Sequence, residues 1–192
     1  MTARSPTREE LSAAYGRKIP DLVAPGLRVL LVGINPSLWS AHVGLHFARP
    51  SNRLWRTLHE AGLTPRRLHP DEQDPELLRH GIGVTNLVAR ATARADELTD
   101  AELRAGVGSL TTLVRRCAPP YVAFLGVTAY RTALHRPRAT VGRQDEPFAG
   151  ATAWVLPNPS GLNAHYQQPA LSAAYAELAR AVEGDAGPPG QR

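Results

Sequence analysis

The sequence predicts one α/β domain with three layers (α/β/α), in which helices cover both faces of a central, mainly parallel sheet of about four to five strands. Two observations lead to this fold class. Short apolar runs without alternating polar residues recur along the 192 residues, and a segment with helical periodicity follows each of them. Strands that alternate with helices in this way form parallel sheets through right-handed crossovers. A chain of this length usually forms a single domain.

The apolar runs are the predicted strands. They are rich in β-branched residues and have the length of strands that are buried on both faces. In chain order they are Leu27 to Ile34, Ile82 to Val88, Tyr121 to Gly126, and Thr152 to Leu156. In an open sheet of this kind, ligands bind beyond the carboxyl ends of the strands. A functional site is therefore expected in the loops that follow these runs.

Helix start signals occur between the strands and after the last one. A cap residue followed by proline fits a first helical turn, and a threonine followed three residues later by glutamate forms a capping box. The expected starts are, in chain order, Ser51, Thr64 with Pro65, Asp74 with Pro75, Thr99 with Glu102, and Pro169.

Both ends of the chain are expected to lie outside the main domain. Residues 1–22 are expected to form an N-terminal extension with one short helix, because Thr7 and Glu10 make a further capping box. The main domain is expected over residues 23–183. Residues 184–192 are rich in glycine and proline and are expected to form a disordered tail.

Composition excludes several classes of protein. No apolar run approaches the roughly 20 residues that span a bilayer, and Met1 to Glu10 lack the apolar core of a secretory signal. The single cysteine, Cys117, cannot form an intramolecular disulfide or a CxxC zinc site. We therefore expect a cytoplasmic protein without a membrane partner.

The basic residues are almost all arginine. The chain has 22 Lys and Arg against 17 Asp and Glu, a net charge of +5, and only Lys18 is a lysine. Arginine suits phosphates and base edges, and a basic chain is attracted to nucleic acid. A GC-rich coding sequence produces the same excess of arginine, so both explanations stay open. A mechanism that needs a Schiff-base lysine in the folded core has almost no candidate.

Two of the loops that follow predicted strands resemble each other. Asn35 to His42 reads NPSLWSAH, and Asn158 to His165 reads NPSGLNAH. Turn chemistry accounts for one such loop, because proline fixes φ, and asparagine and serine bond to nearby backbone. Two similar loops at one edge of a sheet favour a shared cleft.

The predicted loops are poor in carboxylates. Asp and Glu are absent from Leu22 to His59, from Leu103 to Gln144 and from Pro147 to Ala176. A glycosidase-type pair of carboxylates or an acidic Mg²⁺ site is therefore poorly supported, and the seven histidines show no ligand spacing. Phosphate-binding, metalloprotease and serine-hydrolase motifs are also missing. We expect a site without a metal or cofactor that does not repel an anionic substrate.

Four segments carry a resemblance to a known family. They are Gly33 to Pro36, Phe47 with Pro50 to Trp55, Gly83 to Val88, and Leu156 to Leu162. Together they resemble the mismatch-specific uracil/thymine DNA glycosylases of the uracil-DNA glycosylase superfamily. The resemblance implies a monofunctional enzyme that acts on G:U or G:T mismatches in double-stranded DNA. Such an enzyme flips the uracil, or the thymine or another damaged pyrimidine, out of the duplex. It then excises the flipped base by hydrolysis and leaves an abasic site. We expect it to act as a monomer in the nucleoid.

The resemblance also implies roles for single residues. Asn35 matches the family's catalytic asparagine, which can orient a water but does not titrate as a base. Phe47 matches the ring that stacks on the flipped base, and Asn86 matches a polar position that hydrogen-bonds the base or its water. An ordinary core phenylalanine and a turn asparagine are the structural alternatives for these two. The other residues expected at the base pocket are Ile34, Ser40 and His46.

The second of the two similar loops matches the part of the family that enters the DNA. Gly161 to Asn163 would form a wedge in the space that the flipped nucleotide leaves, with the apolar Leu162 as its tip. A hydrophobic cap on the last helix is the structural alternative for Leu162. Backbone groups of the loop would contact the widowed guanine. The residues expected in intercalation and guanine recognition are Asn158, Ser160, Gly161, Leu162 and Asn163.

The sequence departs from the family's pattern next to the expected pocket, and it leaves two other functions open. Ser37 stands where the family usually has glycine, which narrows the room beside the expected water and bears on the range of bases, and Trp39 is bulky next to the pocket. A non-catalytic DNA-damage-binding module of the same fold would bind DNA without releasing a base. A small-molecule nucleoside or nucleotide hydrolase would act on free substrates.

Overall fold

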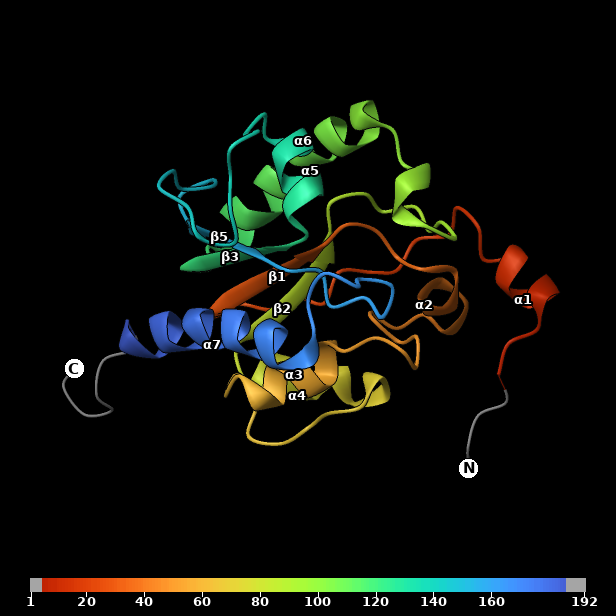
Figure 1. Cartoon of the computed structure of the whole chain (residues 1–192), viewed down its shortest axis with the longest axis horizontal. Coiled ribbons are helices and arrows are strands. Elements are labelled where there is room, and N and C mark those ends of the chain that lie inside the picture. The colour runs from red at the N-terminus through yellow and green to blue at the C-terminus, as the bar shows by residue number, and fades with distance from the viewer. Residues whose placement is uncertain (1–4, 186–192) are drawn as a thin grey trace.

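The computed structural model describes residues 5–185, which contain a five-stranded sheet (Figure 1). The strand order is β2-β1-β3-β5-β4, in which the first four strands are parallel and β4 is antiparallel to β5. The strands are β1 (Val29–Gly33), β2 (Ile82–Asn86), β3 (Tyr121–Leu125), β4 (Gly142–Arg143) and β5 (Thr152–Leu156). The predicted α/β/α fold with a mainly parallel sheet is confirmed.

Each parallel strand lies within the apolar run that predicts it. Along β1, Val29 and Leu31 pack into the core on one face of the sheet, and Leu30 and Val32 pack into the core on the other. A strand that is apolar on both faces shows no alternation in its sequence, which explains the continuous runs. The two-residue strand β4 is not predicted, because it is too short to show any periodicity.

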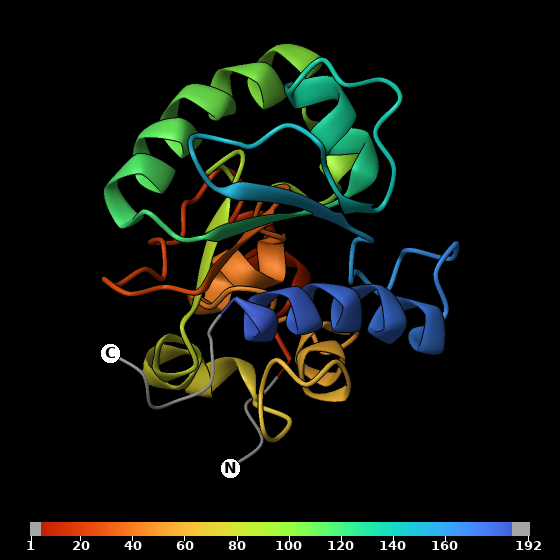
Figure 2. The ribbon, with the colours of Figure 1, turned by 90° about the vertical axis from the view of Figure 1, so that its left-hand side faces the viewer.

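Helices form a layer on each side of the sheet (Figure 2). Helices α5 and α6 cover one face, and α3, α4 and α7 cover the other. The helices are α1 (Arg8–Ser12), α2 (Leu38–Val43), α3 (Leu54–Glu60), η1 (Pro70–Glu72), α4 (Gln73–Arg79), η2 (Ala95–Glu97), α5 (Asp100–Cys117), α6 (Val127–Ala133) and α7 (Gln168–Gly184). Within residues 5–185, none of them is both long enough and apolar enough to cross a membrane.

Most of the predicted helix starts are confirmed. Thr7 and Thr99 cap α1 and α5, each in a capping box with the glutamate three residues later. Pro169 lies in the first turn of α7. Asp74 has a non-helical backbone conformation, so α4 becomes regular at Pro75, as the Asp-Pro pair predicts.

Two of the expected helix starts are wrong. No helix begins at Thr64, whose buried hydroxyl donates a hydrogen bond of 2.9 Å to the Arg66 carbonyl. Helix α3 begins at Leu54 rather than directly after Ser51, and the side-chain oxygen of Asn52 accepts a hydrogen bond of 2.9 Å from the Leu54 N–H. Serine and threonine also stabilise turns, and the local sequence does not separate the two uses.

The N-terminal extension is joined to the sheet. Leu22 and Val84 exchange two backbone hydrogen bonds of 2.8 and 2.9 Å on the outer side of β2. This contact covers the edge of β2 that would otherwise be free to pair with another chain. At the other end, α7 continues through Gly184, and residues 186–192 of the expected tail lie outside the described residues.

Candidate active site

A cleft of about 960 Å³ lies at the carboxyl ends of the parallel strands. The register places the last residues of neighbouring strands side by side, with Gly33 beside Asn86 and Leu125 beside Leu156. The loops that follow these strands therefore open into one cleft, as the two similar loops indicate. All the residues expected from the sequence to form the site line this cleft, namely Ile34, Asn35, Ser40, His46, Phe47, Asn86, Asn158, Ser160, Gly161, Leu162 and Asn163.

Asn35 lies two residues after the end of β1, and its side-chain amide is held in one orientation. Its Nδ2 donates hydrogen bonds to the Arg90 carbonyl at 3.0 Å and to the Thr92 hydroxyl at 2.7 Å. The Thr92 hydroxyl donates its own proton to the Arg94 carbonyl at 2.7 Å, so toward Asn35 it can only accept. None of the residues described in the structure donates to Asn35 Oδ1. This oxygen is therefore a fixed acceptor for a molecule in the cleft.

Two serines tie helix α2 to the cleft. Ser37 caps α2, because its hydroxyl accepts a hydrogen bond of 3.1 Å from the Ser40 N–H. The buried Ser40 hydroxyl accepts from the Ser37 hydroxyl and from the Ala48 N–H, both at 3.1 Å. Ser40 thus holds the segment that carries Phe47 against α2. Its expected contact with the base stays a prediction.

Gly33 has no side chain, and this leaves space for the side chains of Phe47 and Asn86. A Cβ atom at Gly33 would lie 2.5 Å from Asn86 Oδ1 and 3.1 Å from Phe47 Cζ, so a larger residue would displace them. Phe47 has a φ of +50°, and Trp55 Nε1 donates to its carbonyl at 3.1 Å. The ring of Phe47 packs against the core and also lines the cleft, so it fits the stacking role as well as the core role.

His46 is buried, with 3% of its surface exposed, and it holds the amide of Asn86. Its Nε2 lies 2.9 Å from the Pro20 carbonyl, so Nε2 carries the proton. Nδ1 is then an acceptor and receives a hydrogen bond of 3.4 Å from Asn86 Nδ2. Burial lowers the pKa of His46 below its ordinary value of 6.5, against smaller raising effects of the Pro20 hydrogen bond and the Asp21 charge. The ring is therefore neutral at pH 7 and fixes which end of the Asn86 amide faces it.

Residues 157–167 join β5 to α7 and form a loop that we term the wedge loop. Its own side chains shape it: Asn158 Oδ1 accepts from the Ser160 N–H at 2.9 Å, and Ser160 Oγ accepts from the Leu162 N–H at 3.3 Å. Asn163 Nδ2 donates to the Asn158 carbonyl at 2.9 Å. Leu162 is 68% exposed, so it does not cap the last helix. An exposed apolar tip on a structured polar loop has the form of a wedge, and its entry into DNA stays a prediction.

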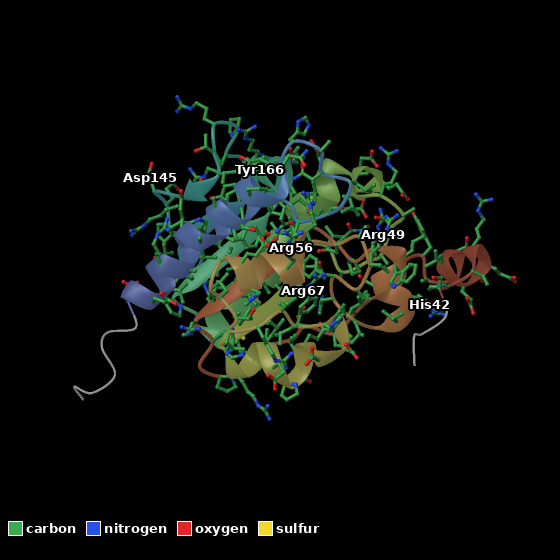
Figure 3. The ribbon with its side chains drawn as sticks, turned by 60° about the horizontal axis from the view of Figure 1, so that its bottom comes forward. His42, Arg49, Arg56, Arg67, Asp145 and Tyr166 are labelled. Carbon is green, nitrogen blue, oxygen red and sulfur yellow. The ribbon has the colours of Figure 1, made fainter. Side chains whose placement is uncertain are left out.

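The cleft contains few charged groups. Of the described residues that line it, Asp96 is the only one with a carboxylate, and Arg94 pairs with it through hydrogen bonds of 2.5 and 3.0 Å. The exposed Arg49 also lines the cleft, and Figure 3 shows it on the side of the molecule that carries α2. The cleft therefore offers no unpaired carboxylate as a base, and it does not repel a phosphate.

Gly33, Thr92 and Arg53 shape this site although the sequence analysis gave them no role. Gly33 had a signal, because a glycine that ends a buried strand marks a close approach of other groups. Thr92 lies 57 residues after Asn35, and Arg53 lies 107 residues before Ser160, whose carbonyl it contacts. Although Arg53 and Ser160 belong to two of the motif segments, the motifs do not show which residues touch, so only the folded chain reveals the last two roles.

The fold and the cleft together define the class of protein. An α/β/α sheet carries at its carboxyl edge a fixed amide, a partly buried ring and an exposed apolar tip, an arrangement that suits a flat ligand with a polar edge. Residues 20–181 match the sequence profile described as the uracil DNA glycosylase superfamily, and the chain belongs to this family. Family membership places it among the DNA glycosylases, which are hydrolases that act on DNA.

A solved structure has the same fold. The chain is similar to a protein of Methanosarcina acetivorans that was solved by solution NMR and assigned provisionally as a uracil DNA glycosylase. The TM-score is 0.59 at 19% sequence identity, and the match covers 85% of this chain and 98% of that one. At this level of identity the similarity shows the fold alone.

Proposed function

We propose that the protein is a monofunctional DNA glycosylase that takes uracil out of duplex DNA and hydrolyses its N-glycosidic bond, leaving an abasic site. The observation that carries this proposal is the fixed acceptor Oδ1 of Asn35 in the cleft. Oδ1 accepts a hydrogen bond from a water and turns its oxygen toward C1′ of the nucleotide. The bond between C1′ and N1 breaks, the electron pair leaves with the base, the water adds to C1′, and its proton passes through solvent to the uracil anion.

The lining of the cleft supports water as the nucleophile, because none of its described residues is a lysine. Lys18 is the only lysine of the chain and belongs to the N-terminal extension, and no lysine is among the described residues that line the cleft. Strand cleavage by a bifunctional enzyme needs an imine with the abasic sugar, and none of the described cleft-lining residues has an amine side chain to form it. Because an amide does not take up the proton of the water, we expect slower turnover than with a carboxylate base.

The base pocket supports uracil rather than cytosine as the substrate. Uracil has an N3–H donor beside its O4 acceptor, whereas cytosine has an N3 acceptor beside its N4 amino donor. Because Asn86 Nδ2 is engaged with His46, the amide oxygen of Asn86 is turned toward Gly33 and can accept from the N3–H. An amide held in this way pairs with the edge of uracil and is mismatched with that of cytosine. Phe47 would stack on the face of the base.

The wedge loop supports a mismatch in duplex DNA as the target. The free energy needed to take a base out of the stack is lowest for a mispair. The exposed Leu162 can fill the space that the base leaves. The side chains of Asn158, Ser160 and Asn163 are used within the loop, so backbone groups would read the widowed guanine. We propose G:U as the main substrate, with G:T and other damaged pyrimidines opposite guanine as further ones.

A base-release assay tests the proposal. A duplex with one G:U pair, incubated with the protein in EDTA and then heated in alkali, should be cut at the uracil. Cutting without alkali would contradict the monofunctional mechanism. A G:T duplex, a single strand with uracil and free uridine, assayed in parallel, define the substrate. Release from free uridine alone would identify a nucleoside hydrolase instead.

The variant Asn35→Ala separates catalysis from binding. It removes the acceptor for the water, so base release should fall at least about 100-fold, while affinity for the G:U duplex stays the same. Undiminished turnover would show that another group holds the water. Binding of the G:U duplex without base release by the unaltered protein would identify a non-catalytic damage-binding module.

A further inference from the structure

We propose that Arg53 positions the wedge loop for duplex DNA, so that this residue governs excision from a duplex but not from a single strand. The inference rests on the proposed function and assigns a role to a residue outside the cleft lining. Arg53 is the N-cap of α3, yet its side chain makes no capping hydrogen bond. The side chain is turned instead toward the wedge loop.

Arg53 donates hydrogen bonds to four backbone carbonyls of the wedge loop. Nη1 of Arg53 donates to the Tyr166 carbonyl at 2.6 Å, and Nη2 donates to the Ser160 and Asn163 carbonyls at 3.0 and 3.1 Å. The backbone N–H of Arg53 donates to the Pro159 carbonyl at 3.0 Å. These contacts span the loop from one side of its apolar tip to the other. The planar guanidinium can reach several acceptors at fixed angles, which an ammonium group cannot do in the same way.

The neighbouring backbone confirms that the loop is seated on this segment. A Cβ atom at Gly161 would lie 2.5 Å from the carbonyl oxygen of Ser51, so the two stretches of backbone are in close contact. The Nε–H of Arg53 is buried and has no partner among the described residues. Burying this group is unfavourable by itself, and the hydrogen bonds to the loop carbonyls offset it.

The contacts with Arg53 and Ser51 hold the wedge loop in place although its tip, Leu162, has no packing of its own. Leu162 is 68% exposed, so no core contact fixes its position, and the base of the loop must do so. A loop that is ordered before it binds loses less conformational entropy on insertion into the duplex. A single strand has no stacked partner to replace, so its uracil reaches the pocket without the wedge. The contribution of Arg53 is therefore confined to duplex substrates.

The test compares uracil release from a G:U duplex and from the same strand alone. We expect Arg53→Gln to lower kcat/KM on the duplex by about 10- to 100-fold and to leave the single strand nearly unchanged. Arg53→Lys should keep part of the duplex activity. Leu162→Ala removes the tip itself and gives the reference for a lost wedge. Arg28→Gln is the matched control, because Arg28 donates from Nε and Nη2 to the His80 carbonyl at 3.2 and 2.9 Å, next to the amino end of β1.

A second readout does not depend on catalysis. A 2-aminopurine beside the uracil becomes more fluorescent when the duplex is unstacked, and Arg53→Gln should reduce this increase as Leu162→Ala does. Equal losses on duplex and single strand, or no loss on either, would overturn the role of Arg53. Base release from neither substrate by the unaltered protein would refute the proposed function, while the fluorescence would still decide whether Arg53 orders the wedge.

Discussion

At the scale of single residues, the cleft works with neutral side chains whose neighbours fix their orientation. The two ends of an amide have nearly the same shape but opposite hydrogen-bonding character, so an amide reads a ligand only if one end is already engaged. Nδ2 of Asn35 donates to the Arg90 carbonyl and to the Thr92 hydroxyl. Nδ2 of Asn86 donates to the neutral ring of His46. Each amide therefore presents its oxygen to the cleft for a reason that can be tested.

Thr92→Val tests the orientation of Asn35. Valine has nearly the shape of threonine but accepts no hydrogen bond, so Nδ2 of Asn35 keeps only the Arg90 carbonyl and the amide turns more freely. We expect kcat for uracil release in single-turnover assays to fall about 10-fold, with the affinity for duplex DNA unchanged. Thr92→Ser keeps the hydroxyl and should retain most of the activity. An equal loss in both variants would point to packing rather than to orientation.

His46 predicts a pH dependence on the acid side. Its pKa lies below the ordinary 6.5, so the neutral ring that accepts from Asn86 dominates at pH 7. A second proton turns Nδ1 into a donor that faces the donor Nδ2 of Asn86, and the amide must turn. We expect kcat/KM to be flat above pH 7 and to fall as the pH drops below 6.5. Because the unfolded chain binds this proton more readily, stability also decreases as the pH falls from 6.5 toward the lowered pKa of the folded state.

The variant Asn86→Ala is the control for that pH dependence. Asn86→Ala should lower uracil release at every pH and flatten the decrease on the acid side, because no amide remains to be turned. A decrease that persists unchanged in Asn86→Ala would assign it to another group. Asp21, whose charge raises the pKa of His46, is the carboxylate to examine next.

At the scale of elements, parallel strands bring the two similar loops to one edge. Strands β1 and β5 both pair with β3, which lies between them, so their carboxyl ends are about 10 Å apart. The first loop runs directly into α2, because Ser37 caps that helix. In the second loop Ser160 bonds within the loop instead, and the chain stays irregular until α7. The same short pattern thus starts a helix in one place and supports a wedge in the other.

Gly33→Ala tests the end of β1. The added methyl group would approach Asn86 Oδ1 to 2.5 Å and Phe47 Cζ to 3.1 Å, so both side chains must move while the strand remains. We expect uracil release to fall about 100-fold with little change in the circular dichroism spectrum. Gly108→Ala is the control, because it lies on α5 where a Cβ meets nothing, and it should keep full activity. Retained activity in Gly33→Ala would show that the pocket has spare room.

At the scale of the whole molecule, the sequence predicts the sheet and the cleft better than the contacts around them. Buried parallel strands are continuous apolar runs, and their ends share one edge, so Asn35 and Asn158 could be placed together without coordinates. The partners Thr92 and Arg53 lie on irregular segments, where no periodicity relates distant positions. The prediction that a helix starts at Thr64 is wrong, because a threonine followed by proline also suits a turn.

The arginine excess has a structural use in addition to any affinity for DNA. Within residues 5–185, every ion pair between side chains contains an arginine, including pairs of Arg66 with Glu72 and of Arg90 with Glu102. Hydrogen bonds from Arg66 and Arg90 lower the pKa of these two carboxyls to about 2. The pairs are exposed or only partly buried, so each contributes little and is weakened by salt. We expect that together they add to the acid sensitivity of the fold.

Glu60 connects α3 to α7 and allows this sensitivity to be tested. Hydrogen bonds from Ser172, Arg56 and Gln168 lower its pKa from 4.5 to about 2. The unfolded chain takes up the proton near pH 4.5, so the stability from this carboxylate is complete above that pH and is lost as the pH falls toward 2. We expect the Tm in calorimetry at low salt to decrease over this range. Glu60→Gln should have a lower Tm at pH 7 and a shallower decrease, whereas Glu177→Gln, an exposed residue of α7, should match the unaltered protein. The same acid dependence in both variants would show that Glu60 does not contribute.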